Sequence, residues 1–408
     1  MNQNPSRVAI ALAVVAAALG FFVDAYDLLL YSIVRNQSLA SLGVAGNALL
    51  STGIDLLNAQ LLGMLAGGIA WGIIGDIWGR RRVLFGSIIL YSAATVANGM
   101  VNGVAAYGAC RFAAGLGLAG ELGAGVTLVS ELMSKRSRGW GTMLVAAIGV
   151  LGVVSASLVG DLFAWRTAYF IGGGLGFMLL LLRLGVRESA LFAQVKSQNV
   201  ARGNFLAFFT NAKRLRRYAC VILLAMPIWY AIGILITFSP EIGAALGLSP
   251  APLAGRTVLL YYAGLSLGDL TNGYLSQVFK TRNKVILAFM IITAVSCAAY
   301  FLCGGASLPV FYGLCGFIGW ACGYWALFVT ISAEQFGTNL RATAAITAPN
   351  FVRGLTALLT IAFKGLRPGI GTLPSAILIG AVIVIIAFIA LAQIEETYGK
   401  DLDYTEAV

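Results

Sequence analysis

The sequence predicts an all-α membrane protein with twelve transmembrane helices in two pseudo-symmetric six-helix bundles. Of its 408 residues, 59% are hydrophobic and only 11% are charged, and the mean hydropathy is +0.89, so its helices are too apolar to face water. The apolar residues form stretches of about 20 residues, the length that crosses a bilayer. Two sequence features occur twice, about 200 residues apart, which indicates a duplicated unit whose halves can move against each other.

The predicted spans follow one another along the chain with one long connection between the sixth and the seventh. They cover residues 8–34, 48–75, 83–101, 104–130, 140–160, 167–183, 218–240, 256–279, 285–304, 309–334, 343–364 and 373–394. The first span is too long for a cleavable signal peptide and is interpreted as a retained helix. The predicted domains are an N-terminal six-helix bundle (1–183), a cytoplasmic linker (184–217) and a C-terminal six-helix bundle with a short cytoplasmic tail (218–408).

The two repeated features are predicted to form gates on the cytoplasmic side. The first copy contains Gly72, Asp76, Gly79, Arg80 and Arg81 with Glu131 and Arg138, and the second contains Gln277 and Arg282 with Glu334 and Arg341. Carboxylates can pair with these arginines and with helix N-termini, and such contacts would hold that side closed. Because Gln277 replaces the acid, the second latch is expected to be weaker. The alternative is that these residues only direct topology and keep the loops soluble.

The basic residues indicate the orientation of the chain in the membrane. The net charge is +11, but the basic residues sit in short clusters between apolar runs, so nucleic acid is not an expected partner. If alternate loops are assigned to the same side of the membrane, the loops on the opposite side contain only five basic residues, namely Arg35, Arg166, Arg256, Lys364 and Arg367. By the positive-inside rule, both termini are predicted to be cytoplasmic, in an integral multi-pass protein of the cell (inner or plasma) membrane.

The sequence offers no pattern typical of catalysis. It has no histidine, and its six cysteines form no CxxC pair, so they are expected to be buried apolar residues and not metal ligands. No nucleophile–base arrangement or phosphate loop appears, and Gly115-x-Gly117-x-x-Gly120 lies inside a membrane helix without a preceding strand. The protein is therefore predicted not to be an enzyme and to carry no cofactor or metal. Proton chemistry would have to use carboxylates.

Several motifs resemble the major facilitator superfamily. They are the glycine and acid spacing that ends in Gly79-Arg80-Arg81 after the second span, the segment from Arg111 to Glu121 in the fourth, and Trp165-Arg166 before the sixth. This resemblance covers nearly the whole chain and implies a transporter with the twelve-helix fold described above.

A second resemblance is to proton-coupled metabolite, phosphate and sugar symporters. It rests on Asp24 and Asp27 in the first span and on Glu121, which follows Gly120, in the fourth. These symporters usually carry two glycines before the glutamate, where this chain has Ala119 and one glycine. The resemblance implies proton coupling but does not identify the substrate.

Four charged residues in the first half are predicted to couple proton movement to transport. Asp24 and Asp27 share one face of the first helix, and one of the two could take up a proton because neighbouring carboxylates repel. Arg111 is the expected counter-charge at a similar depth, and by the resemblance Asp27 is the better match for it. Glu121 is either a second proton site or a packing residue. The alternatives are a helix-capping role for the aspartates and a static salt bridge for Arg111.

The second half is predicted to bind the substrate. Arg353 is the only cation deep in these spans, with Asn350 one turn before it, and an arginine fork there suits a carboxylate or phosphate. Asp269 either neutralises Arg353 or forms part of the site. Four aromatic residues are expected to line the same region, namely Trp229, Tyr230, Tyr261 and Trp325. By contrast, the polar residues that begin the second span are expected to be solvated: Asp55, Asn58 and Gln60.

The function predicted from these patterns is proton-coupled uptake of a small anionic metabolite by alternating access, in a monomer whose partners are protons, the substrate and the lipid bilayer. The alternative is a proton-driven exporter of a drug or siderophore-like metabolite. Exporters of this superfamily often carry a Gly-Pro motif in the fifth span, and residues 140–160 contain no proline, which favours import. A transporter-shaped receptor would need a signalling domain, and residues 395–408 are too short to suggest one.

Overall fold

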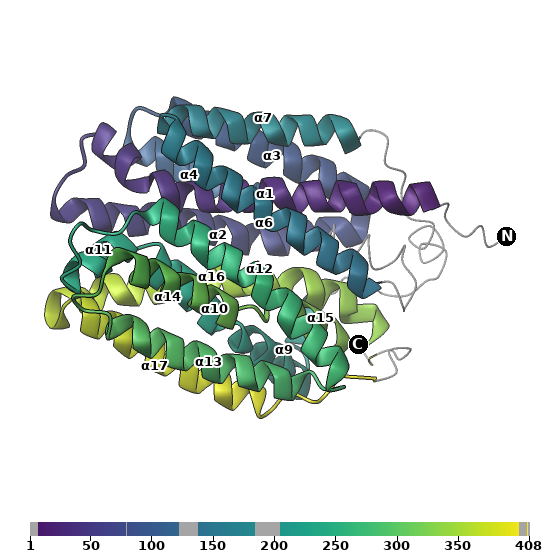
Figure 1. Cartoon of the computed structure of the whole chain (residues 1–408). Helices are drawn as coiled ribbons and strands as arrows, with labels where there is room; N and C mark the ends of the chain where they lie inside the picture. The colour runs from purple at the N-terminus through teal and green to yellow at the C-terminus, as the bar shows by residue number, and fades with distance from the viewer. Residues whose placement is uncertain (1–6, 79, 122–137, 184–204, 400–405, 407–408) are drawn as a thin grey trace.

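The computed structural model describes residues 7–78, 80–121, 138–183, 205–399 and 406, and these residues form helices and no strand. The helices lie side by side in one elongated bundle (Figure 1). The first helix begins and the last helix ends at the same end of this bundle, which we call the terminal end (Figure 1). The opposite end is called the far end.

The helices before the long connection form one group, the N-half. In the described residues its helices are α1 (Arg7–Ser41), α2 (Asn47–Trp78), α3 (Arg80–Met100), α4 (Val104–Leu118), α6 (Arg138–Leu162) and α7 (Trp165–Arg183). Within it, α1 packs against α6, α2 against α4, and α3 against both α4 and α7. The N-half is drawn in purple to teal in Figure 1.

The helices after the connection form the C-half, drawn in green and yellow in Figure 1. They are η1 (Phe205–Phe208), α9 (Ala212–Leu224), α10 (Met226–Tyr230), η2 (Ala231–Ile236), α11 (Ser239–Ala245), α12 (Ala254–Val278), α13 (Asn283–Phe301), α14 (Leu308–Ala321), α15 (Trp325–Glu334), α16 (Thr338–Ile370) and α17 (Thr372–Leu391). Here α12 packs against α14, as α2 does against α4 in the N-half, and α9 packs against α17.

In the described residues this order of helices matches the predicted spans, although residues 122–130 of the fourth span lie outside them. Two spans of the C-half are interrupted. The span predicted at 218–240 is divided into α9, α10 and η2, because Pro227 at the start of α10 has no backbone N–H and η2 is a π-helix. The span predicted at 309–334 is divided at Cys322–Tyr324, between α14 and α15. By length and composition, nine helices of the described chain can cross a membrane, and two shorter ones are also apolar.

Glycines allow the closest helix contacts in both halves. A Cβ on Gly115 of α4 would lie 2.1 Å from the carbonyl oxygen of Gln60 on α2. In the C-half, a Cβ on Gly319 of α14 would lie 1.9 Å from the carbonyl oxygen of Tyr261 on α12. Such contacts bring two backbones together and depend on the absence of a side chain. The same device therefore fixes equivalent helix pairs, and each half is held as a rigid unit.

The two halves meet mainly along α2 and α16, with further contacts between α6 and α12 and between α1 and α12. At the far end, Arg35 of α1 donates a hydrogen bond of 2.6 Å to the carboxylate of Glu241 on α11. The side chain of Arg35 is only 1% exposed. Nearby, Lys364 of α16 forms an ion pair of 2.6 Å with Asp55 of α2, and both side chains are solvent-exposed. Ion pairs between the halves thus hold the far end together.

The prediction that the polar residues at the start of the second span are solvated is right for Asp55 and wrong for its neighbours. Asn58 and Gln60 are buried. Asn58 accepts a hydrogen bond from Thr360 of α16, and Gln60 accepts one from Arg111 of α4. Buried amides need such partners because an unpaired polar group in an apolar environment is costly.

A glycine substitution tests the close contacts inside the C-half. Gly319→Ala should lower the melting temperature of the purified protein, because the new Cβ overlaps a backbone oxygen and overpacking typically costs about 1–3 kcal/mol. Gly313→Ala is the matched control, since Gly313 lies on the same helix and a Cβ added to it would meet nothing within 4 Å. Alanine should leave stability unchanged or raise it there. Equal melting temperatures for the two variants would contradict the proposed packing role.

Candidate functional site

An ion pair at the centre of the molecule joins the two halves. Asp24 of α1 is fully buried, and the guanidinium of Arg353 on α16 is buried beside it, with 3.7 Å between Oδ2 of the aspartate and Nη2 of the arginine. Neither carboxylate oxygen of Asp24 receives a hydrogen bond from another described residue. The main stabilisation of this buried negative charge therefore comes from a residue of the opposite half.

The pairing differs from the predicted one, in which Arg111 is the partner of Asp24 or Asp27. Arg111 of α4 is fully buried and donates a hydrogen bond through Nη2 to the side-chain oxygen of Gln60. Its guanidinium also lies over the ring of Tyr31, 5.0 Å from the ring centroid. These contacts hold Arg111 inside the N-half, and no ion pair between it and either aspartate occurs among the described residues.

Asp27 has a different environment from Asp24, although both carboxylates are fully buried on the same helix. Asp27 accepts a hydrogen bond of 2.8 Å from the hydroxyl of Thr95 on α3. Arg111 attracts its charge through space without direct contact. The partners of Asp27 thus belong to the N-half, whereas the partner of Asp24 belongs to the C-half.

Two tryptophans of the C-half surround the guanidinium of Arg353. Its Cζ lies 5.6 Å from the ring centroid of Trp229 on α10 and 5.9 Å from that of Trp325 on α15. The side chain of Tyr262 interacts electrostatically with both Arg353 and Asp24. Two nitrogens of the guanidinium, Nε and Nη1, are buried without a hydrogen-bond acceptor. The arginine therefore keeps donors that a bound anion can use.

Asp269 does not neutralise Arg353. Its carboxylate accepts a hydrogen bond of 2.9 Å from the backbone N–H of Ala326, in the first turn of α15. The break between α14 and α15 leaves these N–H groups without helical partners, and a carboxylate there is favoured by the helix dipole. The interpretation of Asp269 as a counter-charge is wrong, and its observed contact is that of a helix cap.

Asn350 lies at the interface between the halves. Its side-chain amide donates hydrogen bonds of 3.0 Å to the carbonyl oxygens of Ala119 on the N-half and of Ile346 on its own helix. A Cβ on Gly68 of α2 would lie 2.7 Å from the Cβ of Asn350, so the two helices approach closely here. Asn350 is one turn from Arg353, as predicted, and its donors bind backbone groups.

The remaining residues predicted for the central site lie around this ion pair in different roles. Glu121 is buried, and one of its oxygens is 3.5 Å from the hydroxyl of Ser87 on α3. The hydroxyl of Tyr230 donates to the carbonyl of Ala376, and that of Tyr261 donates to the carbonyl of Ile228. Both tyrosines bind backbone groups inside the C-half. Of the four predicted aromatic residues, the structure brings the two tryptophans to Arg353.

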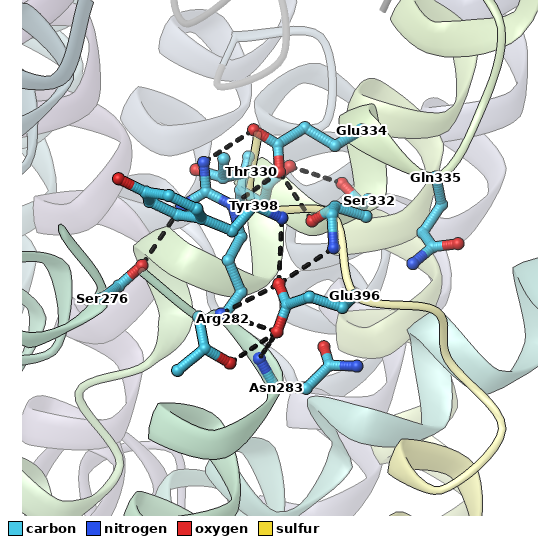
Figure 2. Close-up of polar contacts among 12 residues, drawn as sticks. Ser276, Arg282, Asn283, Thr330, Ser332, Glu334, Gln335, Glu396 and Tyr398 are labelled. Carbon is cyan, nitrogen blue, oxygen red and sulfur yellow. Dashed lines mark hydrogen bonds and ion pairs between the residues drawn. The ribbon is translucent and has the colours of Figure 1, made fainter. Parts of the chain in front are cut away.

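A second polar cluster lies at the terminal end of the C-half (Figure 2). Arg282, just before α13, forms an ion pair of 2.6 Å with Glu334 at the end of α15. Nη2 of the same guanidinium donates a hydrogen bond of 2.8 Å to this carboxylate. The hydroxyl of Thr397 also donates to Glu334. Two predicted gating residues are thus in direct contact.

Glu396 completes this cluster, as Figure 2 shows. Its carboxylate accepts hydrogen bonds from the hydroxyl of Thr281 and from the backbone N–H groups of Arg282 and Asn283 at the start of α13. Partial burial disfavours its charged form, but these hydrogen bonds outweigh that effect and lower its pKa from 4.5 to about 2. The second copy of the repeat therefore has ionic contacts although Gln277 itself is exposed.

Other predicted gating residues are described only in part. Gly72 of α2 lies opposite Thr347 of α16, and a Cβ there would be 3.7 Å from the threonine methyl group. Gly79 and Glu131 lie outside the described residues. For four others only the helical backbone is described, namely Asp76, Arg80, Arg81 and Arg138. Arg341 lies in the first turn of α16 and is partly buried.

Three residues of these networks were not predicted from the sequence. Gln60 is a polar residue inside an apolar stretch, and this could have indicated that it faces a partner in the protein and not lipid. Thr95 gives no such signal, because a threonine in a membrane helix can satisfy its hydroxyl with its own backbone. Glu396 follows the last span, where a carboxylate is expected to be solvated.

Comparison with known proteins agrees with this architecture. Residues 8–255 match the model of the major facilitator superfamily. The niacin transporter of Acinetobacter baylyi is 24% identical over 85% of this chain and 86% of its own length. The 3-(3-hydroxy-phenyl)propionate transporter of Escherichia coli is 25% identical over 72% of each chain. The crystal structure of a D-xylose–proton symporter has the same fold, with a TM-score of 0.71 and 17% identity over 96% of this chain and all of that one. The chain belongs to the major facilitator superfamily and is a multi-pass membrane transporter.

Proposed function

We propose that the protein imports a small anionic metabolite together with protons, by alternating access between its two halves. The observation that carries this proposal is the buried ion pair between Asp24 and Arg353, because each residue belongs to a different half. A change in the charge of either residue alters the energy with which the halves are held together.

In the proposed cycle, protons and substrate act on the same pair. Deprotonated Asp24 neutralises Arg353. Protonation of Asp24 removes the negative charge, and the guanidinium then needs another anion because an uncompensated charge in the membrane interior is costly. A substrate carboxylate or phosphate supplies it at the guanidinium, where Nε and Nη1 have no acceptor and protonation of Asp24 releases Nη2. Proton uptake and anion binding therefore favour each other.

The other predicted proton-coupling residues have supporting roles in this proposal. Asp27 and Arg111 attract each other inside the N-half and stay close to electrical neutrality as a set. Glu121 is close enough to repel the charge of Asp24, which would favour its protonation. Trp229 and Trp325 hold the guanidinium of Arg353 in place through cation–π contacts.

Gates at both ends would alternate in this cycle. We propose that the terminal end is cytoplasmic and the far end external, in the inner or plasma membrane, with the protein acting as a monomer. The ion pair of Arg35 and Glu241 then closes the external side. The contact of Arg282 with Glu334 lies inside the C-half and is present together with the far-end pair, so in this proposal it braces the C-half, and the arginine and acid residues of the N-half repeat would close the cytoplasmic side in the opposite state. Residues 1–183 and 218–408 would move as the two bodies and 184–217 would connect them.

Two relatives support an organic anion as the substrate, since one is named for niacin and the other for a phenylpropionate, and both compounds are carboxylic acids. The competing function is proton-driven export of a drug-like compound. It would use the same acids, but Arg353 would then have no anion to bind when Asp24 is protonated.

Neutralising Asp24 tests the coupling. In proteoliposomes with an inward proton gradient, the unmodified protein should accumulate radiolabelled nicotinate or 3-(3-hydroxyphenyl)propionate, and a protonophore should abolish this. Asp24→Asn should lose accumulation against a gradient but keep exchange of labelled for unlabelled substrate, because the amide mimics the protonated acid and leaves Arg353 available. The measurement compares accumulation of substrate against its gradient with exchange of labelled for unlabelled substrate.

Asp27→Asn is the matched control, because Asp27 lies on the same helix and its partners are in its own half. It should change uptake less than Asp24→Asn does. If Asp27→Asn uncoupled the protein and Asp24→Asn still accumulated substrate, the assignment of the proton to Asp24 would be wrong. Efflux of labelled substrate driven by an inward proton gradient would favour the exporter.

The far-end latch gives a second prediction. Arg35→Gln should weaken closure of the far end by about 1.5–3 kcal/mol, since a charged hydrogen bond is lost and Glu241 remains partly buried. Spin labels at Ser41 and Ala251, both exposed near this end, should then report longer distances between the halves. Lys364→Gln removes an exposed pair and should change these distances less. An unchanged distance distribution in Arg35→Gln would rule out the latch.

A further inference from the structure

We propose that the anion bound at Arg353 is an aromatic monocarboxylate, a planar ring carrying one carboxylate. This inference rests on the proposed function, because it names the substrate class for the same site. It depends on three features of the described residues: the unused donors of the arginine, the charge balance around it and the two indole rings beside it.

The donors favour a carboxylate over a neutral ligand. The side chain of Arg353 is 2% exposed, and its Nε and Nη1 have no acceptor, while Nη2 faces Asp24. Buried donors without acceptors are costly, so a ligand that accepts from them is favoured. Nε and Nη1 lie on opposite edges of the guanidinium, and Nη2, which protonation of Asp24 releases, forms with either of them the planar fork that matches the two oxygens of a carboxylate.

The charge balance favours a single negative charge. When Asp24 is protonated, Arg353 contributes one positive charge, and one carboxylate restores neutrality. Arg111 does not supply a second free cation, because it bonds to Gln60 and its charge is offset by Asp27. A dianion would therefore leave an uncompensated negative charge in the membrane interior.

The indole rings favour an aromatic ligand. Trp229 and Trp325 come from different helices, and their centroids lie 6.0 Å apart at an interplanar angle of 58°. The two ring centroids lie 5.6 and 5.9 Å from Cζ of the guanidinium, so a ligand bound by Arg353 has two aromatic side chains near its binding group. Ring contacts of this kind stabilise an aromatic ligand beyond simple burial.

The polar residues nearby do not favour a sugar. The amide of Asn350 donates to two backbone carbonyl groups, and the carboxylate of Asp269 accepts from the backbone of α15. A polyol needs many hydrogen-bond partners for its hydroxyl groups, and of these two side chains only the oxygen of Asn350 is left without a partner.

Binding of four small probes to the purified protein tests this inference by isothermal titration calorimetry. Benzoate and cyclohexanecarboxylate have the same charge and similar size, and only the first is aromatic. Benzamide has the shape of benzoate without its charge, and phthalate carries a second carboxylate. Benzoate should bind about 3- to 10-fold more tightly than cyclohexanecarboxylate, given the usual contribution of an aromatic pair. Benzamide and phthalate should bind much more weakly.

Substitution of the tryptophans identifies the source of this preference. Trp229→Leu and Trp325→Leu should each reduce the preference for benzoate over cyclohexanecarboxylate, and Trp229→Phe should restore most of it. Trp320→Leu is the control, because Trp320 packs on Phe289 and Phe317, away from Arg353. The melting temperature of each variant checks that it folds. If a leucine variant does not fold, the preference of the phenylalanine variant for benzoate is compared with that of the unmodified protein.

The outcomes separate this inference from the proposed function. Equal affinity for benzoate and cyclohexanecarboxylate, with binding abolished by Arg353→Gln, would overturn the aromatic class and leave anion transport intact. Tighter binding of phthalate would overturn the single charge. If none of the carboxylates bound, or if Arg353→Gln did not weaken their binding, both the aromatic class and the anion site at Arg353 would be wrong.

Discussion

The ion pair of Asp24 and Arg353 is the constraint on which the rest of the structure depends. Each charge is buried, and breaking a buried pair by removing one partner costs on the order of 3–5 kcal/mol. Since the two residues belong to different halves, the separation of the halves that we propose needs a proton for Asp24 and another anion for Arg353. In this proposal, the charge of this one pair of side chains is thereby linked to the relative position of the N-half and the C-half.

The remaining contacts support a movement of rigid bodies. Inside each half, glycines such as Gly115 and Gly319 bring helix backbones together so closely that the helices cannot slide without a clash. Between the halves, the contacts are of a more reversible kind. They are ion pairs at the far end, such as Arg35 with Glu241, and single hydrogen bonds such as that of Asn350 at the centre. Contacts of this kind can break and re-form in a cycle, whereas packed backbones cannot.

The fold could be predicted from the sequence because bilayer thickness and hydropathy fix the number and length of helices, and duplication fixes their grouping. The burial of Asp24, Asp27, Arg111 and Arg353 inside the protein could be predicted because charges in apolar spans need partners. Which charge pairs with which could not, since depth along a helix does not give the rotation of that helix. Arg111 and Arg353 both lie at a suitable depth, and only the packing of α16 against the N-half brings Arg353 to Asp24.

The two aspartates of α1 show how position within the interface assigns different roles to identical side chains. Asp27 bonds to Thr95 and is attracted by Arg111, so a change in its charge alters energies inside the N-half, which remains intact through the cycle. Asp24 has its counter-charge on α16, so a change in its charge alters the energy between the halves. A ligand or proton shifts a conformational equilibrium only by the difference in its free energy between the two states. In the cycle that we propose, Asp24 is therefore the one of the two whose protonation drives the movement.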